Sequence, residues 1–403
     1  MSAPSEFRYR DRAHSRRARV VRRVTRAVAG FDPAPSPELL SAFEEAYQRG
    51  DPLAETFVRE QGRQGLSAAR QKLASAQGSP TRDGVSAALG ALLDDLNARP
   101  AWLDEAKLAL GAKTFRRYGS AVFRFAGAIT LAGYRESSVA KPLALSGAYV
   151  GAGTRARFLE TASFWIEVSE PGGLDPSAKG FEMTQHVRLL HAMVRLRVRP
   201  HPEWNEAAWG VPINEDDALL TLMGGSVAPG LLMRVLGFRT SRVEIEAMLH
   251  FWRYVGHLMG VRFSPYPEHI EDALRISYIA WLKGSGTAGE DGRALCRSYV
   301  EAFASAPDDG VFGWLEEGLH RGMTRLFLPT AVYREQGLPP AGLWPLLPLS
   351  AFPLVFVAET LRRRVPGLDG IADHIARAER RAWLERNTSG RVAPFAPAEQ
   401  LTR

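Results

Sequence analysis

The sequence has 403 residues, of which 45% are hydrophobic and 24% are charged, and its formal net charge is +7. A chain of this size can bury a large core, either in one large helical domain or in two or three smaller ones. Cys296 is the only cysteine. The sequence therefore excludes an intramolecular disulfide, a thiolate zinc cluster and the covalent attachment of a c-type haem.

The basic charge is concentrated at the N-terminus. Residues 1–26 contain nine arginines against Glu6 and Asp11, which accounts for the whole net charge, and the rest of the chain is neutral. This distribution predicts a basic, disordered arm over residues 1–30 and no general nucleic-acid-binding surface. An arm that contacts nucleic acid or anionic lipid is the alternative.

The same arm contains Arg16-Arg17, which resembles the start of a twin-arginine export signal. Such a signal needs an uncharged apolar run next. Four further arginines interrupt the run here, namely Arg19, Arg22, Arg23 and Arg26. We therefore expect no signal peptide and a cytoplasmic protein.

Helical periodicity extends over residues 31–386, which we expect to form a single all-α domain. The clearest helix begins at Ser36-Pro37 and ends at Gly50, because a capping serine and a terminal glycine mark its two ends. Strand-type alternation is scarce, and residues 387–403 are predicted to be a frayed tail. Further helices are predicted over residues 54–76, 84–98, 103–111, 114–132, 139–149, 152–168, 181–198, 215–224, 229–236, 241–259, 268–283, 293–305, 310–320, 322–328, 349–363 and 369–386.

Residues 337–358, "GLPPAGLWPLLPLSAFPLVFVA", contain no charged residue. A membrane-spanning helix would need about 20 such residues, but five prolines here argue against a regular helix. We interpret the stretch as buried or cofactor-lining. Contact with a membrane surface or an oily substrate is the functional alternative.

Two motifs carry little functional weight. The pattern Gly284-x-Gly286-x-x-Gly289 matches a dinucleotide fingerprint, but it follows a helical pattern and not a strand, so it is predicted to be a loop. Glu317-x-x-His320 occurs once, whereas a carboxylate-bridged di-iron site needs two such elements.

The stretch "HVRLLHAMVRLRV" (186–198) is the strongest candidate for a functional site. Arg188, His191 and Arg195 share one face of a predicted helix. Two guanidiniums beside an imidazole in an apolar helix are costly to bury unless an anion lies opposite. A satisfied core histidine is the plainer interpretation of His191.

A second predicted helix, "TRARFLETASFWIEV", lies upstream and carries Arg157, Glu160 and Thr161. An iron porphyrin would satisfy both helices. Its metal binds a neutral imidazole, its wide face packs against leucines, and its propionates pair with guanidinium groups.

Four pieces of the chain, in order, resemble the latex clearing protein and mpaB oxygenase family. They are Arg157-x-x-x-Thr161, Arg188-x-x-His191-x-x-x-Arg195, "WGVPINEDD" (209–217) and "EAMLHFWRYVGHLMGV" (246–261). The resemblance covers about residues 95–330. It implies a globin-like helical core enlarged by additional helices, which binds haem b without a covalent link.

The resemblance also implies roles for single residues. His191 would be the proximal iron ligand, and Arg188 and Arg195 would hold the ligand helix and the haem periphery. Arg157, Glu160 and Thr161 would be catalytic positions near the distal side of the haem. Three other histidines (His186, His250 and His257) are expected to pack, cap or face away from the haem.

The family uses dioxygen to cleave carbon–carbon double bonds, and its rubber oxygenases act on polyisoprene. In those enzymes a lysine precedes the motif threonine, where this sequence has Glu160. This departure and the expected cytoplasmic location predict an apolar, unsaturated small molecule as the substrate. Two alternatives stay open: a haem-binding sensor or carrier without turnover, and a helical binding protein whose arginine arm engages nucleic acid. The oligomeric state stays open.

Overall fold

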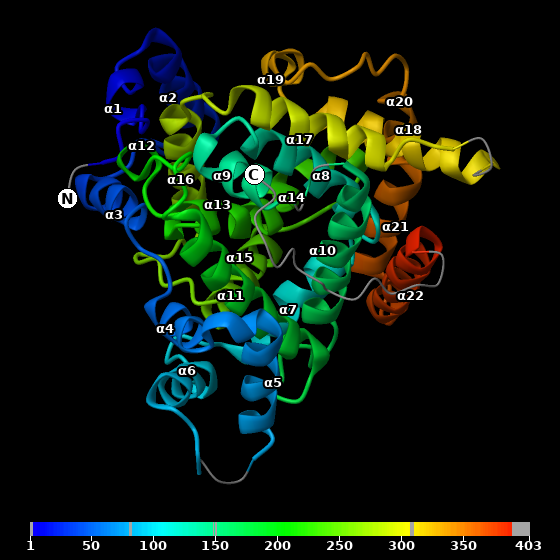
Figure 1. Cartoon of the computed structure of the whole chain (residues 1–403). Coiled ribbons are helices and arrows are strands. Elements are labelled where there is room, and N and C mark those ends of the chain that lie inside the picture. The colour runs from blue at the N-terminus through cyan, green and yellow to red at the C-terminus, as the bar shows by residue number, and fades with distance from the viewer. Residues whose placement is uncertain (1–2, 80–82, 148, 150, 307–309, 389–403) are drawn as a thin grey trace.

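The computed structural model describes residues 3–79, 83–147, 149, 151–306 and 310–388, and within these ranges it contains helices and no strands (Figure 1). The predicted all-α class is confirmed. The longer helices are α2 (Arg16–Ala29), α3 (Pro37–Ala46), α4 (Pro52–Glu60), α5 (Gly65–Gln77), α6 (Ala87–Asn97), α7 (Glu105–Arg116), α8 (Ala121–Gly133), α9 (Ser137–Ser146), α10 (Thr154–Ser169), α11 (Lys179–Val198), α13 (Glu215–Gly225), α15 (Arg242–Leu258), α16 (Ile270–Lys283), α17 (Gly289–Ala302), α18 (Gly310–Phe327), α21 (Phe352–Arg364) and α22 (Leu368–Thr388). The short ones are α1 (Tyr9–Arg12), α12 (Glu206–Trp209), α14 (Val227–Leu232), α19 (Thr330–Glu335) and α20 (Leu346–Ser350), with 3₁₀ turns η1 (Gly62–Gln64), η2 (Gly151–Gly153) and η3 (Met233–Leu236).

The predicted helices are present, with differences where glycine interrupts or fails to interrupt the chain. The range 54–76 was expected as one helix but forms α4 and α5, since Gly62 and Gly65 adopt positive φ angles that end one helix before the next begins. Conversely, 310–320 and 322–328 join into the single helix α18, because Gly322 keeps helical geometry.

The N-terminal arm is folded, contrary to the expected disorder. Phe7 and Tyr9 are buried, and the Phe7 ring packs edge-on against Tyr47 at 5.8 Å. The backbone N–H of Arg8 donates to the Lys283 carbonyl at 3.0 Å, so the arm is attached to the end of α16. The arginines predicted a solvated segment, but Phe7, Tyr9 and Ala18 are buried against the main body, whereas Val20, Val24 and Val28 are exposed.

The two central helices, α7 and α15, pack against each other more closely than ordinary side chains allow. A Cβ on Gly111 would lie 2.0 Å from the carbonyl oxygen of Ala247, so only glycine permits this approach. Helix α15 begins with a capping box, in which Ser241 and Glu244 each bind the other's backbone N–H. The rings of Phe115, Trp165 and Trp252 meet beside this contact.

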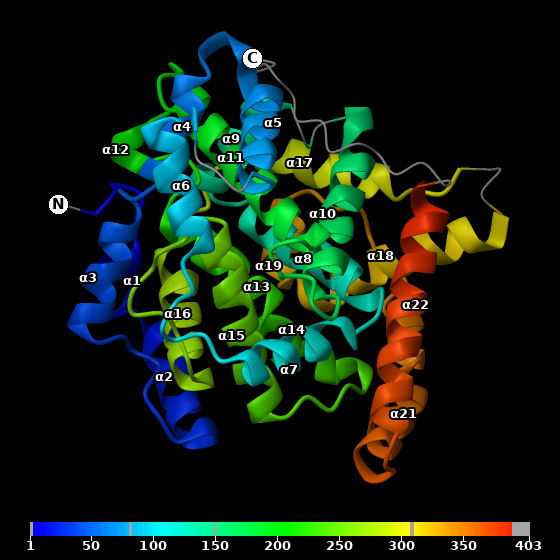
Figure 2. The same cartoon turned by 90° about the horizontal axis from the view of Figure 1, so that it is seen from below.

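Helix α11 lies between two groups of helices. It packs against α10 and α15 of the main body, and against α4 and α5 of the N-terminal region. In Figure 2, α4, α5 and α6 lie together along one edge of the molecule, next to α11. The N-terminal helices therefore cover the helix that carries the candidate site.

The uncharged stretch 337–358 is exposed over much of its length, although Leu338 and Ala341 belong to a hydrophobic core cluster. Leu343 is 79% exposed and Leu354 is 77% exposed, which corrects the prediction of a buried or cofactor-lining segment. Another part of the described chain, Glu215–Leu236, is long and apolar enough to cross a membrane, but 56% of its most apolar window is buried inside the protein. We therefore regard it as a core element. The predicted frayed tail lies outside the described residues from 389 onward.

The two weaker motifs have structural roles. Residues 284–288 are a loop between α16 and α17, as predicted, because the preceding segment is a helix and not a strand. His320 is buried. Its Nδ1 forms a hydrogen bond with the Tyr299 hydroxyl at 2.7 Å, and its Nε2 lies 3.1 Å from a carboxylate oxygen of Glu316. In the described part of the chain no group of three or more His, Cys, Asp or Glu side chains is placed to hold a metal ion.

Candidate functional site

The six residues singled out in the sequence lie on two helices that pack against each other. Helix α11 carries Arg188, His191 and Arg195, and helix α10 carries the other three. Spacings of three and four residues place each trio on one side of its helix. The two helices are thus neighbours, but each trio finds its hydrogen-bond partners separately: Arg188 and Arg195 bind residues of the N-terminal region and the Ile213 carbonyl, whereas Arg157 and Thr161 bind residues on and beside α10.

His191 is a neutral, unengaged imidazole. Burial and, to a smaller extent, the positive charge of Arg195 lower its pKa to about 4, so the ring carries no charge at neutral pH. The side chain is only half-buried by its accessible surface, and no described residue forms a hydrogen bond with the ring.

The anions opposite Arg188 are protein carboxylates. Its Nε and Nη2 donate to the two oxygens of Asp51 at 2.6 and 3.1 Å, and its Nη1 donates to Asp95 at 2.6 Å. Arg188 is 2% exposed and Asp51 is 4% exposed. Asp95 is also bound by Arg262 at 2.7 Å, which with Arg188 lowers the pKa of Asp95 against the effect of its burial.

Arg195 is satisfied in a similar way. Its Nε donates to Glu55 at 2.6 Å and its Nη1 donates to the carbonyl of Ile213 at 3.0 Å. Sequence reasoning expected haem propionates at Arg188 and Arg195, and the structure supplies carboxylates from α4 and α6 instead. Both arginines hold α11 in place, and a contact of either with a cofactor stays a prediction.

Helix α10 carries an arginine and a glutamate that form an ion pair. Arg157 donates to Glu160 at 2.7 Å, and burial nevertheless raises the pKa of Glu160 above its usual value. The Thr161 hydroxyl donates to the Arg157 carbonyl at 3.1 Å and lies 3.3 Å from the Tyr149 hydroxyl. Glu160 is 8% exposed, so it does not point into bulk solvent.

Two residues near this pair were missed in the sequence. Tyr149 contacts Thr161 and packs edge-on against Phe158 at 5.3 Å. Arg70, on α5, lies close to Glu160 and Arg157. Burial lowers the pKa of Arg70, the charge of Glu160 raises it and the charge of Arg157 lowers it. Neither belongs to a motif, and Arg70 lies far from α10 in sequence, so no local pattern marks them.

The remaining histidines behave as expected where the structure tests them. His250 accepts a hydrogen bond from the backbone of Asp104 at 3.0 Å, and both His250 and His257 pack edge-on against Trp102. His186 lies 3.6 Å from Glu182, and its expected orientation away from a haem stays a prediction.

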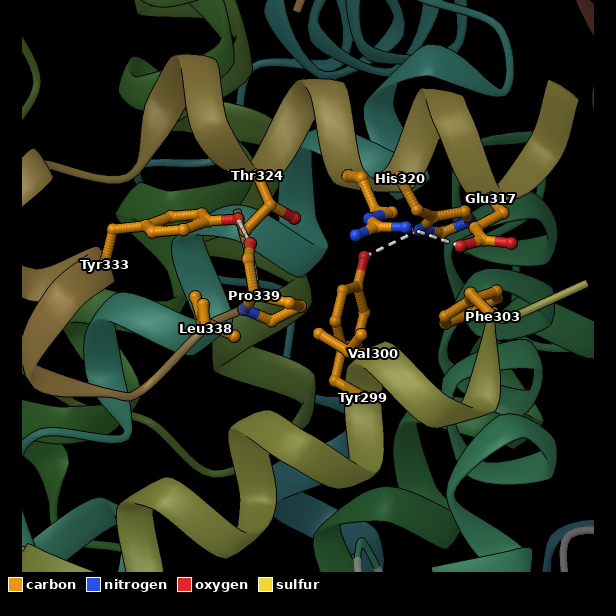
Figure 3. Close-up of a pocket in the computed structure, with 10 residues that line it drawn as sticks. Tyr299, Val300, Phe303, Glu317, His320, Thr324, Tyr333, Leu338 and Pro339 are labelled. Carbon is orange, nitrogen blue, oxygen red and sulfur yellow. Dashed lines mark hydrogen bonds and ion pairs between the residues drawn. The ribbon is translucent and has the colours of Figure 1, made fainter. Parts of the chain in front are cut away.

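A pocket beside His320 is separate from the candidate site. Figure 3 shows its lining, with Tyr299 and Phe303 below helix α18 and with Tyr333 on the other side. Its volume is about 10 Å³, which is enough for about one water molecule. It therefore cannot hold a cofactor or a substrate.

Comparison with known proteins connects both helices to one family. Residues 115–358 match the model of the family described as "ER-bound oxygenase mpaB/B'/Rubber oxygenase, catalytic domain". The chain is 25% identical over 183 residues to a rubber oxygenase of Streptomyces sp. (strain K30). This match covers 44% of this chain and 44% of that relative.

A solved structure of latex clearing protein in the closed state has a similar fold. The TM-score is 0.64 at 20% sequence identity, and the match covers 83% of this chain and 91% of that chain. At this identity the likeness supports the fold, which includes the packed helices α10 and α11.

Proposed function

Because the chain belongs to the mpaB and rubber oxygenase catalytic-domain family, we propose that it is a haem-b-dependent oxygenase. It uses dioxygen to oxidise an apolar, unsaturated small molecule, with cleavage of a carbon–carbon double bond as the reaction class. The observation that carries the proposal is the state of His191. A neutral imidazole that forms no hydrogen bond with a described residue is the kind of ligand that haem b takes from a protein.

The described residues around His191 fit this cofactor. Haem b supplies iron for dioxygen chemistry, and the protein supplies position and electrostatics. The ion pairs of Arg188 and Arg195 fix the direction of α11, and with it the direction of the imidazole. Arg70 and Arg157 place positive charge near α10, where an anionic cofactor group would be stabilised.

Glu160 is suited to hold a proton near the reacting atoms. Burial raises the pKa of Glu160, so its carboxyl group keeps a proton at higher pH than an exposed glutamate does, and Arg157 limits this rise in pKa. The Thr161 and Tyr149 hydroxyls lie within 3.3 Å of each other and can orient a small polar molecule. The half-buried aromatic side chains Phe158 and Trp165 lie on the same side of α10 as Thr161 and favour an apolar substrate.

An absorption spectrum tests the proposal directly. Full-length protein produced with a haem supply should show a Soret band, and His191→Ala should abolish or shift it. His186→Ala is the matched control, because it removes an imidazole from the same helix, and it should leave the band unchanged. Equal spectra for the wild type and His191→Ala would contradict the proposal. Glu160→Gln should change the ferric spectrum or its pH dependence.

The second candidate is a haem-binding sensor or carrier without turnover. It is favoured by the direct ion pair between Arg157 and Glu160, which engages the distal carboxylate where rubber oxygenases have a lysine. Dioxygen consumption with candidate alkenes separates the two functions. A red protein that consumes no dioxygen with any of them would support the carrier. The cytoplasmic location stays a prediction.

A further inference from the structure

The C-terminal part of the protein exposes an unusual amount of apolar side chain. Among the described residues, half of the large hydrophobic side chains that are exposed lie between residues 343 and 375. Monomeric soluble proteins rarely expose large contiguous apolar patches unless the patch binds something. We call the following set the C-terminal apolar face: Leu232, Val235, Leu346, Phe352, Leu354, Phe356, Val357 and Leu361.

The elements that carry this face are packed together. Turn η3 contacts both α20 and α21, and α20 contacts α21. Leu354, Val357 and Leu361 follow each other at three- and four-residue spacing, so they form one stripe along α21. Figure 2 shows the α21–α22 hairpin projecting at one edge of the molecule, opposite α4 and α5. The face therefore lies away from the helices that cover the candidate site.

A groove lined by arginines and aromatic rings opens on the other flank of α21, where Phe352, Phe356 and Arg363 follow each other at helical spacing. Its volume is about 310 Å³, and Phe238, Phe352 and Phe356 line it with Arg234, Arg239 and Arg363. The rings of Phe352 and Phe356 are stacked at 5.7 Å, and the Arg239 guanidinium lies over the Phe356 ring at 5.1 Å. Positive charge is thus held beside apolar surface.

Two of these charges lack a carboxylate partner. Arg363 pairs with Glu244 at 2.9 Å. Arg234 instead donates to the Thr240 carbonyl at 2.7 Å, and Arg239 donates to the Thr360 hydroxyl at 2.9 Å. Within the described chain neither forms an ion pair, so the groove carries net positive charge.

We propose that the C-terminal apolar face docks the protein onto an anionic lipid bilayer. Helix α21 lies along the bilayer, so that the stripe on one flank enters the boundary between headgroups and acyl chains, and Arg234 and Arg239 bind lipid phosphates at the groove on the other flank. A second copy of this chain is a poorer occupant, because a two-fold interface would bring four unpaired guanidiniums close together. The proposal is independent of the haem proposal, since it involves neither α10 nor α11.

Vesicle flotation with the full-length protein tests the apolar part. Vesicles of phosphatidylglycerol and phosphatidylcholine should carry the protein, and phosphatidylcholine alone should carry much less. The double variant Leu354→Glu/Val357→Glu should lose binding at least tenfold. Both positions are exposed, so the fold should survive, which circular dichroism checks. The control Ala74→Glu/Ser75→Glu adds the same charges on α5, at the opposite edge, and should bind as the wild type does.

The arginines are tested separately. Arg234→Gln/Arg239→Gln should lower the partition onto anionic vesicles roughly thirtyfold, at about fivefold per arginine near an anionic surface. The control Arg59→Gln/Arg99→Gln removes two arginines from other exposed positions and should have a far smaller effect. Equal binding to anionic and neutral vesicles, or equal effects of the two double variants, would overturn the proposal. So would a dimer in sedimentation that Leu354→Glu/Val357→Glu dissociates, with no vesicle binding by the wild type.

Discussion

Replacing Arg188 by methionine should strongly destabilise the protein. Methionine keeps much of the apolar stem, but Asp51 is left as a buried carboxylate without a counter-charge, since it is only 4% exposed. Asp95 is less affected because Arg262 still binds it at 2.7 Å. Breaking one buried ion pair costs about 3–5 kcal/mol, so we expect the free energy of unfolding to fall by about that amount.

Urea unfolding of the haem-free protein, followed by circular dichroism, measures this loss. Arg195→Met is the matched comparison, and it should cost less, about 1–3 kcal/mol, because the side chain of its partner Glu55 is 17% exposed and also accepts the backbone N–H of Asp51. In Arg188→Met/Asp51→Asn the orphaned charge is gone, so part of the loss should be recovered. A loss below about 1 kcal/mol for Arg188→Met, or no recovery in the double variant, would refute this reasoning.

Two further predictions concern pH and packing. The pKa of His191 is lowered to about 4 in the folded state, so the unfolded state binds the extra proton first as pH falls from about 6.5. The haem-free wild type should therefore lose about 3 kcal/mol more stability by pH 4 than His191→Gln does, and parallel pH profiles would contradict this. Gly111→Ala should destabilise the protein by more than about 2 kcal/mol, because its Cβ would lie 2.0 Å from the Ala247 carbonyl oxygen. Gly90→Ala is the control, because there is open space around that position, and thermal unfolding should show it to be neutral or slightly stabilising.

The sequence predicted what depends on neighbouring residues. Helical periodicity located α10 and α11, and the spacing of Arg188, His191 and Arg195 indicated that one side of α11 needed an anion. It could not identify that anion as Asp51, because 137 residues separate the two side chains. Long-range ion pairs leave no local pattern, so propionates were the only anions that the motif itself suggested.

Two other differences have a common cause. The arginines of residues 1–26 predicted a solvated arm, and the uncharged stretch 337–358 predicted burial, and both predictions used average composition alone. In the arm, Phe7 and Tyr9 are buried against the main body. In the uncharged stretch, prolines and short helices leave Leu343 and Leu354 exposed. Which side of a segment meets the core is decided by tertiary packing, which composition does not record.

The ion pairs of α11 also indicate how much of the chain must be present for the protein to fold. The family match begins at residue 115, yet Asp51, Glu55 and Asp95 precede it and neutralise both arginines of the ligand helix. A fragment that contained only the matched residues 115–358 would leave the buried guanidiniums of Arg188 and Arg195 without their carboxylate partners. The family match therefore covers a smaller region than the one we expect to fold by itself, because the carboxylates that neutralise Arg188 and Arg195 come from the first hundred residues.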